Sequence, residues 1–428
     1  MSNGRSKPDL MNIAIFSVVP FPFGTAASTR TRSLALGLKE AGAEVTVFAL
    51  PPVGSPLLPN NGSLVPQHWR GITCYLTWRS GIPAPPKSSS ILRNLVNRLL
   101  KGRNVAPFIG EALGFLDDVC AKEKRFDLII LYNQDWKLGR SLAALCRRYS
   151  IAFVQSFSER HTPADYKLGV LEPHFLREYF HFFLIPRYCD GAVVISTGLK
   201  NMLPKYLHDR TVVVPAMTNT ESGGGSIDRK LEKNIFQVAY FGGGNRRENP
   251  KLLIDAAAIL LRTFPHLRLV LFGLLPEVLS HLTEEVSRKH LENTVRLRGR
   301  VKEEELRELF GATDVFVLPR ISDFSAQCSF PTRLPELLLT GAPVIVSNVG
   351  DVGLYLEDTK SAIFLRKGTS EELVEKIVFL IANPEIKESI GSCGRTVVDN
   401  CFSYRKWGDE VLSFFQTNIL GGPMENEH

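Results

Sequence analysis

The chain alternates many times between two patterns of apolar and polar positions along its 428 residues. Short runs rich in β-branched residues, such as NIAIFSVV at 12–19, are followed by longer segments with apolar residues every three or four positions. The short runs are typical of strands buried on both faces, and the longer segments of amphipathic helices. In the first half we expect strands at 12–19, 43–50, 127–132, 151–157, 191–196 and 211–215, and helices at 29–42, 137–149, 176–188 and 198–207. This alternation predicts an α/β fold in which helices cover both faces of a parallel sheet.

A polar, glycine-rich segment at 217–234 interrupts the alternation and is typical of a linker. The alternation then restarts. Strands are expected at 236–242, 268–273, 295–299, 314–319, 343–347 and 362–366, and helices at 250–263, 276–289, 303–311, 334–340, 369–382 and 404–419. Since 428 residues exceed one ordinary core, we expect two doubly wound, Rossmann-like domains, at 1–216 and 235–402. Ligands of open α/β sheets bind beyond the carboxyl ends of the strands, so the two domains are expected to face a central cleft.

The composition is that of an ordinary soluble globular protein, with 44% hydrophobic and 22% charged residues. No apolar run reaches the roughly 20 residues that span a bilayer. The first ten residues are polar and lack the apolar core of a signal peptide. The seven cysteines are scattered and none has C-x-x-C spacing. This usage predicts reduced thiols in the cytoplasm, and neither a disulfide framework nor a zinc site.

The positive charge of the chain is concentrated in one stretch. The formal net charge is +7, and no acid occurs between Glu44 and Glu111. Within 70–105 the apolar residues of ILRNLVNRLLKGRNV (91–105) recur at helical spacing with basic residues between them. A basic amphipathic segment can lie on an anionic membrane, so we expect a peripheral contact at its inner face through 70–105. A surface helix with a solvated basic face is the alternative. No motif for nucleic-acid binding accompanies the patch, so nucleic acid is not an expected partner.

Two loops of the first domain carry candidate polar groups directly after expected strands. The loop after 12–19 contains Gly24, where the backbone can come close to a ligand, and continues to Arg30 near a helix start, which favours an anion. The loop after 151–157 contains Glu159 and His161, and a histidine there could bind sugar hydroxyls or handle protons. In the alternative interpretation the first loop only turns the chain, and the histidine is structural or solvated.

The first loop of the second domain, FGGGNRRENP at 241–250, follows a strand in the same way. Gly243 and Gly244 allow close backbone approach, and Arg246 and Arg247 offer planar guanidinium groups that suit phosphate. The alternative is a flexible loop with solvated arginines. Neither glycine loop has the G-x-G-x-x-G spacing, so a dinucleotide-dependent dehydrogenase finds no support.

The segment SAQCSFPTRLPELLLTGAPVIV at 325–346 combines a loop, a short helix and a strand. Pro335 fits only the first turn of a helix, which is therefore expected to begin at 332–334 and to end at Gly341. Arg333 adds positive charge near the helix start, and Glu336 could accept hydrogen bonds from a ribose diol. The backbone N–H groups expected at this edge belong to Ser329, Phe330, Thr332 and Arg333. In the alternative interpretation Arg333 and Glu336 merely flank an apolar run.

Taken together, these segments resemble the GT4-type glycosyltransferases (glycosyl transferases group 1). The resemblance covers nearly the whole chain and includes DGAVVISTGLKNML, FGGGNRRENPKLLIDAAAIL and PTRLPELLLTGAPVIVSNVG. It implies a GT-B fold, a nucleotide-sugar donor and retention of configuration at the anomeric carbon. It also implies that the segment 403–428 contains a helix that crosses back to the first domain.

The resemblance assigns residues unevenly. In the family's donor motif E-x7-E, Glu336 matches the second glutamate, which is associated with the ribose, while Cys328 stands at the first. Gly243 and Glu248 stand where the family has an arginine and a lysine in its phosphate loop, and Arg246 with Arg247 is expected to substitute. The implied catalytic residues are His161, Arg246 and Arg333. The implied donor-binding residues are Gly24, Gly243, Gly244, Arg247, Cys328, Ser329, Phe330 and Glu336, and the implied acceptor residues are Arg30 and Glu159.

The function implied is a retaining transfer of a sugar from a UDP or GDP donor to a saccharide or lipid-linked acceptor in polysaccharide or glycoconjugate synthesis. No D-x-D pair occurs in the chain, so we expect no metal and no cofactor. The alternative is a non-catalytic partner or scaffold protein that keeps the fold with a degenerate donor site.

Overall fold

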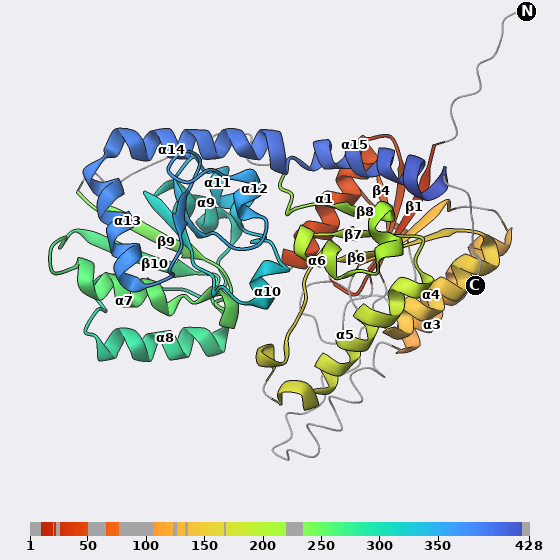
Figure 1. Ribbon diagram of the computed structural model, residues 1–428, viewed down its shortest axis with the longest axis horizontal. Coiled ribbons are helices and arrows are strands. Elements are labelled where there is room, and N and C mark those ends of the chain that lie inside the picture. The colour runs from red at the N-terminus through yellow and green to blue at the C-terminus, as the bar shows by residue number, and fades with distance from the viewer. Residues whose placement is uncertain are drawn as a thin grey trace, which may run out of the picture. The chain divides into compact units, whose positions relative to one another are not determined.

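The computed structural model describes residues 10–19, 21–22, 26–49, 66–76, 106–122, 126–132, 136–166, 168–219 and 234–421. The chain divides into two compact units, one of Met1–Val214 with Tyr404–His428 and the other of Pro215–Ser403. Each unit contains a predominantly parallel sheet flanked by helices (Figure 1). The predicted α/β class with two Rossmann-like domains is therefore confirmed. No helix in the described ranges is long and apolar enough to cross a membrane.

The first unit contains an eight-stranded sheet in the order β3-β4-β2-β1-β5-β6-β7-β8. All neighbouring strands are parallel except β3 and β4, which pair antiparallel. The central strands are almost wholly buried because helices cover both faces, and Phe16 of β1 stacks on Phe48 of β2 with centroids 4.4 Å apart. The strands are β1 (Asn12–Ser17), β2 (Glu44–Ala49), β3 (Pro66–Trp69), β4 (Ile72–Leu76), β5 (Leu128–Tyr132), β6 (Ala152–Phe157), β7 (Gly191–Val194) and β8 (Thr211–Val213).

The last helix of the chain belongs to this first unit. In Figure 1 α15 lies alongside α1, and the Tyr404 hydroxyl donates to Glu40 Oε1 at 2.6 Å. The two helices approach closely where Gly37 faces Gly408. The helices of the unit are α1 (Ala26–Glu40), α3 (Ala106–Lys122), α4 (Trp136–Tyr149), α5 (Pro173–Leu184), α6 (Thr197–Met202) and α15 (Tyr404–Phe414), with short turns η1 (Pro163–Asp165), η2 (Gly169–Leu171), η3 (Ile185–Tyr188), η4 (Lys205–Arg210) and η7 (Phe415–Leu420).

The second unit contains a six-stranded parallel sheet in the order β11-β10-β9-β12-β13-β14. One face packs its aliphatic side chains against α7, α8 and α13. On the other face Phe310 of α9 lies edge-on to Phe241 of β9 and Phe316 of β12. The strands are β9 (Phe236–Phe241), β10 (Leu267–Phe272), β11 (Val295–Leu297), β12 (Val315–Leu318), β13 (Val344–Ser347) and β14 (Ile363–Leu365). The helices are α7 (Lys251–Leu260), α8 (Pro276–Arg288), α9 (Glu303–Gly311), α10 (Phe324–Gln327), α11 (Leu334–Leu338), α12 (Val352–Tyr355), α13 (Ser370–Ala382) and α14 (Pro384–Val397), with η5 (Arg246–Glu248) and η6 (Val398–Phe402).

The structure differs from the sequence-based expectation at several points. Strands β3 and β4 and helices α3, α10, α12 and α14 were not predicted. The helix expected at 198–207 breaks after Met202, because Pro204 cannot donate to the preceding turn. The expected linker begins at 217, but Met217 and Thr218 are buried and Thr218 N–H donates to Phe402 O at 2.9 Å. Residues 220–233 of that segment, and 77–105 of the basic stretch, lie outside the described residues.

Candidate functional site

The strand order locates the edge of each sheet where ligands of open α/β folds bind. In the second unit the chain direction around the sheet reverses at β9, which lies between β10 and β12. The loops after β9 and β12 leave the sheet at this switch point, the usual ligand position. In the first unit the corresponding reversal lies at β1, between β2 and β5. The candidate residues of the second unit therefore belong to one edge of its sheet.

An ion pair marks the start of α11 at this edge. Arg333 Nη1 lies 2.8 Å from Glu336 Oε2, and both side chains are partly exposed. The Arg333 guanidinium also lies 4.4 Å from the centre of the Phe241 ring. Burial alone would lower the pKa of Arg333, but the Glu336 carboxylate raises it above its usual value. α11 begins at Leu334 with Pro335 in its first turn, which lies within the predicted range. The structure thus holds a rigid cation beside a carboxylate acceptor.

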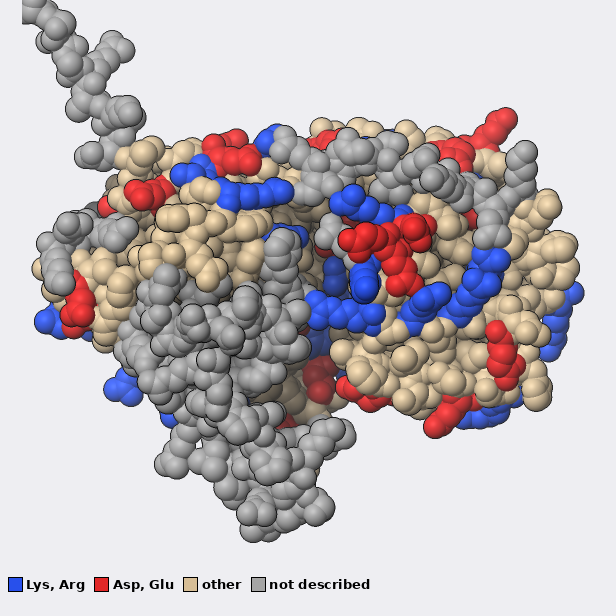
Figure 2. All heavy atoms as spheres, turned by 180° about the vertical axis from the view of Figure 1, so that it is seen from behind, with Lys and Arg blue, Asp and Glu red and all other residues tan. Residues whose placement is uncertain are grey.

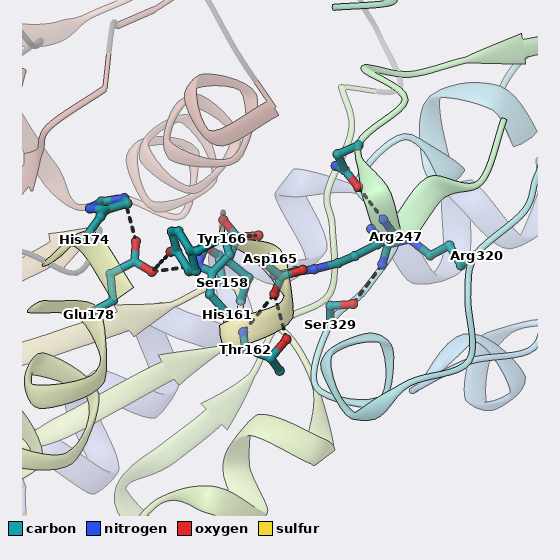
Figure 3. A network of polar contacts seen from close by, with 12 residues as sticks. Ser158, His161, Thr162, Asp165, Tyr166, His174, Glu178, Arg247, Arg320 and Ser329 are labelled. Carbon is teal, nitrogen blue, oxygen red and sulfur yellow. Dashed lines mark hydrogen bonds and ion pairs between the residues drawn. The ribbon is translucent and has the colours of Figure 1, made fainter. Parts of the chain in front are cut away.

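The loop before α11 uses its groups differently from the expectation. The Ser329 N–H donates to Ala326 O at 3.2 Å and is not free to bind an anion, because it belongs to the turn that ends α10. Its hydroxyl instead accepts a hydrogen bond from Arg320 Nη1 at 2.8 Å (Figure 3). Cys328 is 3% exposed. Its N–H donates to Phe324 O, which places this residue at the end of α10.

The Phe330 side chain is part of the core of the second unit. Its ring is 2% exposed and lies edge-on to Tyr355 at 5.6 Å, with Phe402 at the same centroid distance. Any contact of Phe330 with a donor would therefore come from its backbone. Arg320, which the sequence did not single out, lies directly after β12 and its N–H donates to Ser347 Oγ at 2.8 Å.

Both arginines of the glycine loop after β9 contact the loop that follows β12, Arg246 through its side chain and Arg247 through its backbone. Arg246 is about half exposed and its Nη2 lies 3.1 Å from Asp323 Oδ2. Arg247 is 6% exposed, and its carbonyl accepts from the Ile321 N–H at 3.0 Å. These contacts tie the loop after β9 to the loop after β12. On the face of the second unit that Figure 2 draws, several basic side chains form a band beside a group of acidic ones.

Glu248 faces the same loop and was expected only as a replacement for a basic residue. It ends η5, which Asn245 caps, and its carboxylate accepts hydrogen bonds from the backbone N–H groups of Gly244 and Asn245. Gly244 has φ +74°, a conformation that favours glycine. Leu275 N–H donates to the Gly243 carbonyl at 3.0 Å, which holds this part of the loop against the start of α8.

In the first unit His161 belongs to a cluster of polar side chains built on α5 (Figure 3). His161 Nδ1 lies 2.8 Å from Glu178 Oε2, and His174 Nε2 lies 3.2 Å from Glu178 Oε1. The Tyr166 hydroxyl donates to Glu178 Oε2 at 2.6 Å. The other ring nitrogen of His161, Nε2, lies 3.6 Å from Glu159 Oε2, so the imidazole is flanked by two carboxylates.

Glu178 is the residue on which this cluster converges, and sequence reasoning missed it. It occurs within the apolar segment LREYFHFFL, and the only sequence signal was its spacing of four from His174. Burial would raise the pKa of Glu178, but the hydrogen bond and charge of His161 hold it below its usual value. Glu178 therefore stays ionised and orients the imidazole of His161.

The remaining candidates of the first unit have different positions. Gly24 lies outside the described residues. Arg30 is 4% exposed, and its Nη2 donates to the carbonyl of Val214 at 2.8 Å, so it connects α1 to the end of β8. Glu159 is about half exposed. The structure thus brings Glu159 together with His161 but places Arg30 in a buried structural contact.

We expect the buried His181 to make stability depend on pH. Burial lowers the pKa of His181 to about 3, although the nearby Glu178 opposes this. In the unfolded chain a histidine has a pKa of about 6.5. Below that pH the unfolded state binds a proton that the folded state does not, so stability is lost as pH falls from about 6.5, by up to about 1.4 kcal/mol per pH unit. The substitution His181→Gln cannot titrate and can still donate to Gln155, so its unfolding free energy should fall less steeply between pH 7 and pH 5.

Urea unfolding at a series of pH values measures this difference. His68→Gln, at an exposed position of β3 in the same unit, is the control and should keep the wild-type slope. Equal slopes for wild type and His181→Gln would show that His181 does not contribute.

Comparison with known proteins finds a family match over part of the chain. The family model described as glycosyl transferases group 1 matches residues 227–397. The D-inositol 3-phosphate glycosyltransferase of Paenarthrobacter aurescens is 23% identical over 415 residues, 91% of this chain and 92% of that protein. The protein of the same name from Segniliparus rotundus is 24% identical over 200 residues, which are 45% of this chain and 42% of that relative.

Solved structures of glycosyltransferases have the same fold. Sucrose-phosphate synthase from Thermosynechococcus elongatus matches with a TM-score of 0.70 at 19% identity, over 96% of this chain and 100% of that one. HepE of Anabaena, solved in complex with UDP, matches with a TM-score of 0.62 at 15% identity, over 95% of this chain and 100% of that one. The predicted GT-B fold is confirmed by these similarities.

Proposed function

Because this chain belongs to the group 1 glycosyltransferases and has the GT-B fold, we propose that it transfers a sugar from a UDP or GDP donor with retention at the anomeric carbon. The observation that carries the proposal is the Arg333–Glu336 pair beside the β9/β12 switch point. A nucleotide-sugar donor offers a diphosphate and a ribose diol. A fixed guanidinium suits the first and a carboxylate the second. HepE, a protein of the same fold, has been solved with UDP-glucose.

In this proposal the second unit binds the donor. Arg333 stabilises the negative charge that develops on the departing diphosphate, and Glu336 accepts hydrogen bonds from the ribose. Arg246 and Arg247 of the glycine loop add positive charge at the same sheet edge. Because arginines can take this role, the proposed reaction needs no divalent metal.

A panel of UDP- and GDP-sugars tests the donor proposal. Turnover of at least one donor is expected for wild type, unaffected by EDTA, and Glu336→Ala should lose most of it. The anomeric coupling constant in the NMR spectrum of the product should match that of the donor sugar. A wild-type protein that turns over no nucleotide sugar, or that inverts the anomeric centre, would contradict the proposal.

We propose further that the first unit holds the acceptor, a saccharide or lipid-linked saccharide. The imidazole of His161, oriented by Glu178 and close to Glu159, suits sugar hydroxyls. An acceptor that carries a lipid must be reached at a membrane surface. Exposed side chains of the first unit are therefore candidates for a membrane contact.

The outer face of η2 and α5 exposes an unusual number of large apolar side chains. Arg177 and Arg187, both exposed, flank them. Aromatic and aliphatic residues next to basic ones suit an anionic membrane interface. We define this α5 surface by Leu168, Val170, Leu171, Leu176, Tyr179, Phe180 and Phe183. It is proposed as the docking surface for an anionic membrane, with or without the basic stretch at 70–105.

Sedimentation with anionic liposomes checks this expectation. Wild type should bind, and binding should weaken as salt rises because charge contributes. The double variant Leu171→Ser with Phe180→Ser should lose most of the binding while its turnover of a soluble donor is kept. Leu354→Ser, at a position that is 68% exposed on α12 of the other unit, is the matched control. Negligible binding of wild type at every salt concentration would refute membrane docking.

A further inference from the structure

The glycine loop that follows β9, residues 242–245, already holds a carboxylate from its own chain. Glu248 Oε2 accepts hydrogen bonds from the Gly244 N–H at 2.7 Å and from the Asn245 N–H at 3.3 Å. The Tyr240 hydroxyl donates to the same oxygen at 2.8 Å. Three donors thus converge on one carboxylate oxygen, an arrangement that would otherwise suit a phosphate oxygen.

The surroundings hold this carboxylate in place. Tyr240 is fully buried. Burial and the neighbouring Glu248 raise the pKa of its hydroxyl well above the usual value, so it remains a donor. A Cβ at Gly242 would lie 2.5 Å from the Tyr240 oxygen, and a Cβ at Gly244 would lie 2.7 Å from Val278 Cγ1. Gly242 therefore leaves room for the Tyr240–Glu248 pair, and Gly244 lets the loop pack against Val278.

Positive charge reaches this carboxylate from the loops that follow β12. The Glu248 carboxylate, like that of Glu336, raises the pKa of Arg333. The positive charge of Arg320 opposes the effect of burial and of Glu248, which raise the pKa of Tyr240. Arg320 is held at its side chain by Ser329 and at its backbone by Ser347. Both guanidinium groups thus have fixed partners. Arg333 also lies 4.4 Å from the ring of Phe241, the residue before the glycine loop, and the N–H of Ile321, next to Arg320, donates to the Arg247 carbonyl at 3.0 Å.

We propose that Glu248 fills the anion position of the glycine loop, so that the donor's diphosphate is held from the β12 side by Arg320 together with Arg333. Glu248 is then a positioning residue whose negative charge weakens diphosphate binding, and Arg320 is a further binding residue. This inference rests on the proposed function because it takes the ligand to be a diphosphate.

The proposal predicts that a substitution at Glu248 increases the affinity of the site for a diphosphate. Glu248→Gln keeps an oxygen that can accept from the Gly244 and Asn245 N–H groups but removes the negative charge. Repulsion between that charge and a nearby diphosphate should disappear, which at the effective dielectric of protein sites corresponds to about tenfold tighter binding. Arg320→Ala removes a fixed cation and should weaken binding about tenfold or more. A purely structural Glu248 would give the opposite sign, because a damaged loop binds less well.

Calorimetric titration with UDP and GDP, and separately with inorganic pyrophosphate, tests the proposal on the full chain. Glu277→Gln is the matched control, because Glu277 is an exposed acid near the outer side of the same loop. It should change the affinity for UDP by less than about twofold, since exposed charges are screened. Thermal unfolding of each variant establishes that it is folded.

Tighter binding of UDP to Glu248→Gln, with weaker binding to Arg320→Ala, is the expected result. A folded Glu248→Gln that binds UDP no more tightly than wild type would overturn the inference and leave the proposed function standing. If UDP and GDP fail to bind but pyrophosphate binds Glu248→Gln more tightly than wild type, the inference holds and the proposed donor fails. Should Glu248→Gln not fold, Arg320→Ala decides, and an unchanged affinity for UDP would overturn the proposal.

Discussion

Replacing Arg333 by alanine is expected to lower kcat/KM for the nucleotide-sugar donor about 100-fold. The substitution removes a guanidinium held by Glu336 at 2.8 Å and by the face of Phe241. A hydrogen bond to a charged group is worth about 1.5–3 kcal/mol, and the charge that develops on the leaving diphosphate adds to its effect in the transition state. Arg333→Lys keeps the charge but not the planar fork, so it should restore only part of the activity.

A matched control separates this effect from a general loss of surface charge. Arg366 is an exposed arginine of the same unit that pairs with Asp358 at 2.9 Å. Arg366→Ala should keep the wild-type kcat/KM within about twofold, as exposed ion pairs contribute little. An Arg333→Ala variant that is folded and has at least a third of the wild-type kcat/KM would remove Arg333 from the donor site.

The largest effect on stability is expected for Gly408→Ala, at the contact between α15 and α1. A Cβ at position 408 would overlap the backbone of Gly37, which cannot move aside as a flexible side chain would. The two helices would have to separate, and overpacking of this kind costs about 1–3 kcal/mol. We therefore expect Tm to fall by roughly 5–10 °C, measured by thermal unfolding with circular dichroism.

The sign of this change is informative because helix propensity predicts the opposite. Alanine in place of glycine within an exposed helix gains up to about 1 kcal/mol. Gly114→Ala in α3 is the control, since no atom lies within 4 Å of its added Cβ, and it should keep or raise Tm. A Gly408→Ala variant as stable as wild type would contradict the close approach of α15 to α1.

Most of the fold could be predicted from the sequence because its strands are continuous apolar runs. β9, expected at 236–242 and found at Phe236–Phe241, shows how closely such a run defines a buried strand. β3 was missed since Pro66–Trp69 is mostly exposed and carries no such pattern. β4 was missed although Ile72, Cys74 and Tyr75 are buried, because Ile72–Leu76 is a short run. α14 was missed because its sequence, PEIKESIGSCGRTV, contains glycines at contact positions that read as breaks, among them Gly391 beside the backbone of Gly341.

The candidate site was less predictable because many of its contacts lie in irregular loops. The start of α11 was anticipated from Pro335, a local signal. The bond from Arg320 to Ser329 and the convergence of Tyr240 and Gly244 on Glu248 depend on the path of loops, which single residues do not encode. Arg30 resembled a ligand-binding residue by position alone, and only the structure reveals its bond to Val214.

The central claim is that the second unit binds a nucleoside diphosphate at the loops after β9 and β12. Calorimetric titration of wild type and Arg333→Ala with UDP and GDP tests it most directly. The account predicts saturable binding of at least one of them to wild type, with one ligand per chain, and binding at least tenfold weaker to Arg333→Ala. Absence of saturable binding of both nucleotides to the folded wild-type chain would contradict it and favour a non-catalytic partner with a degenerate donor site.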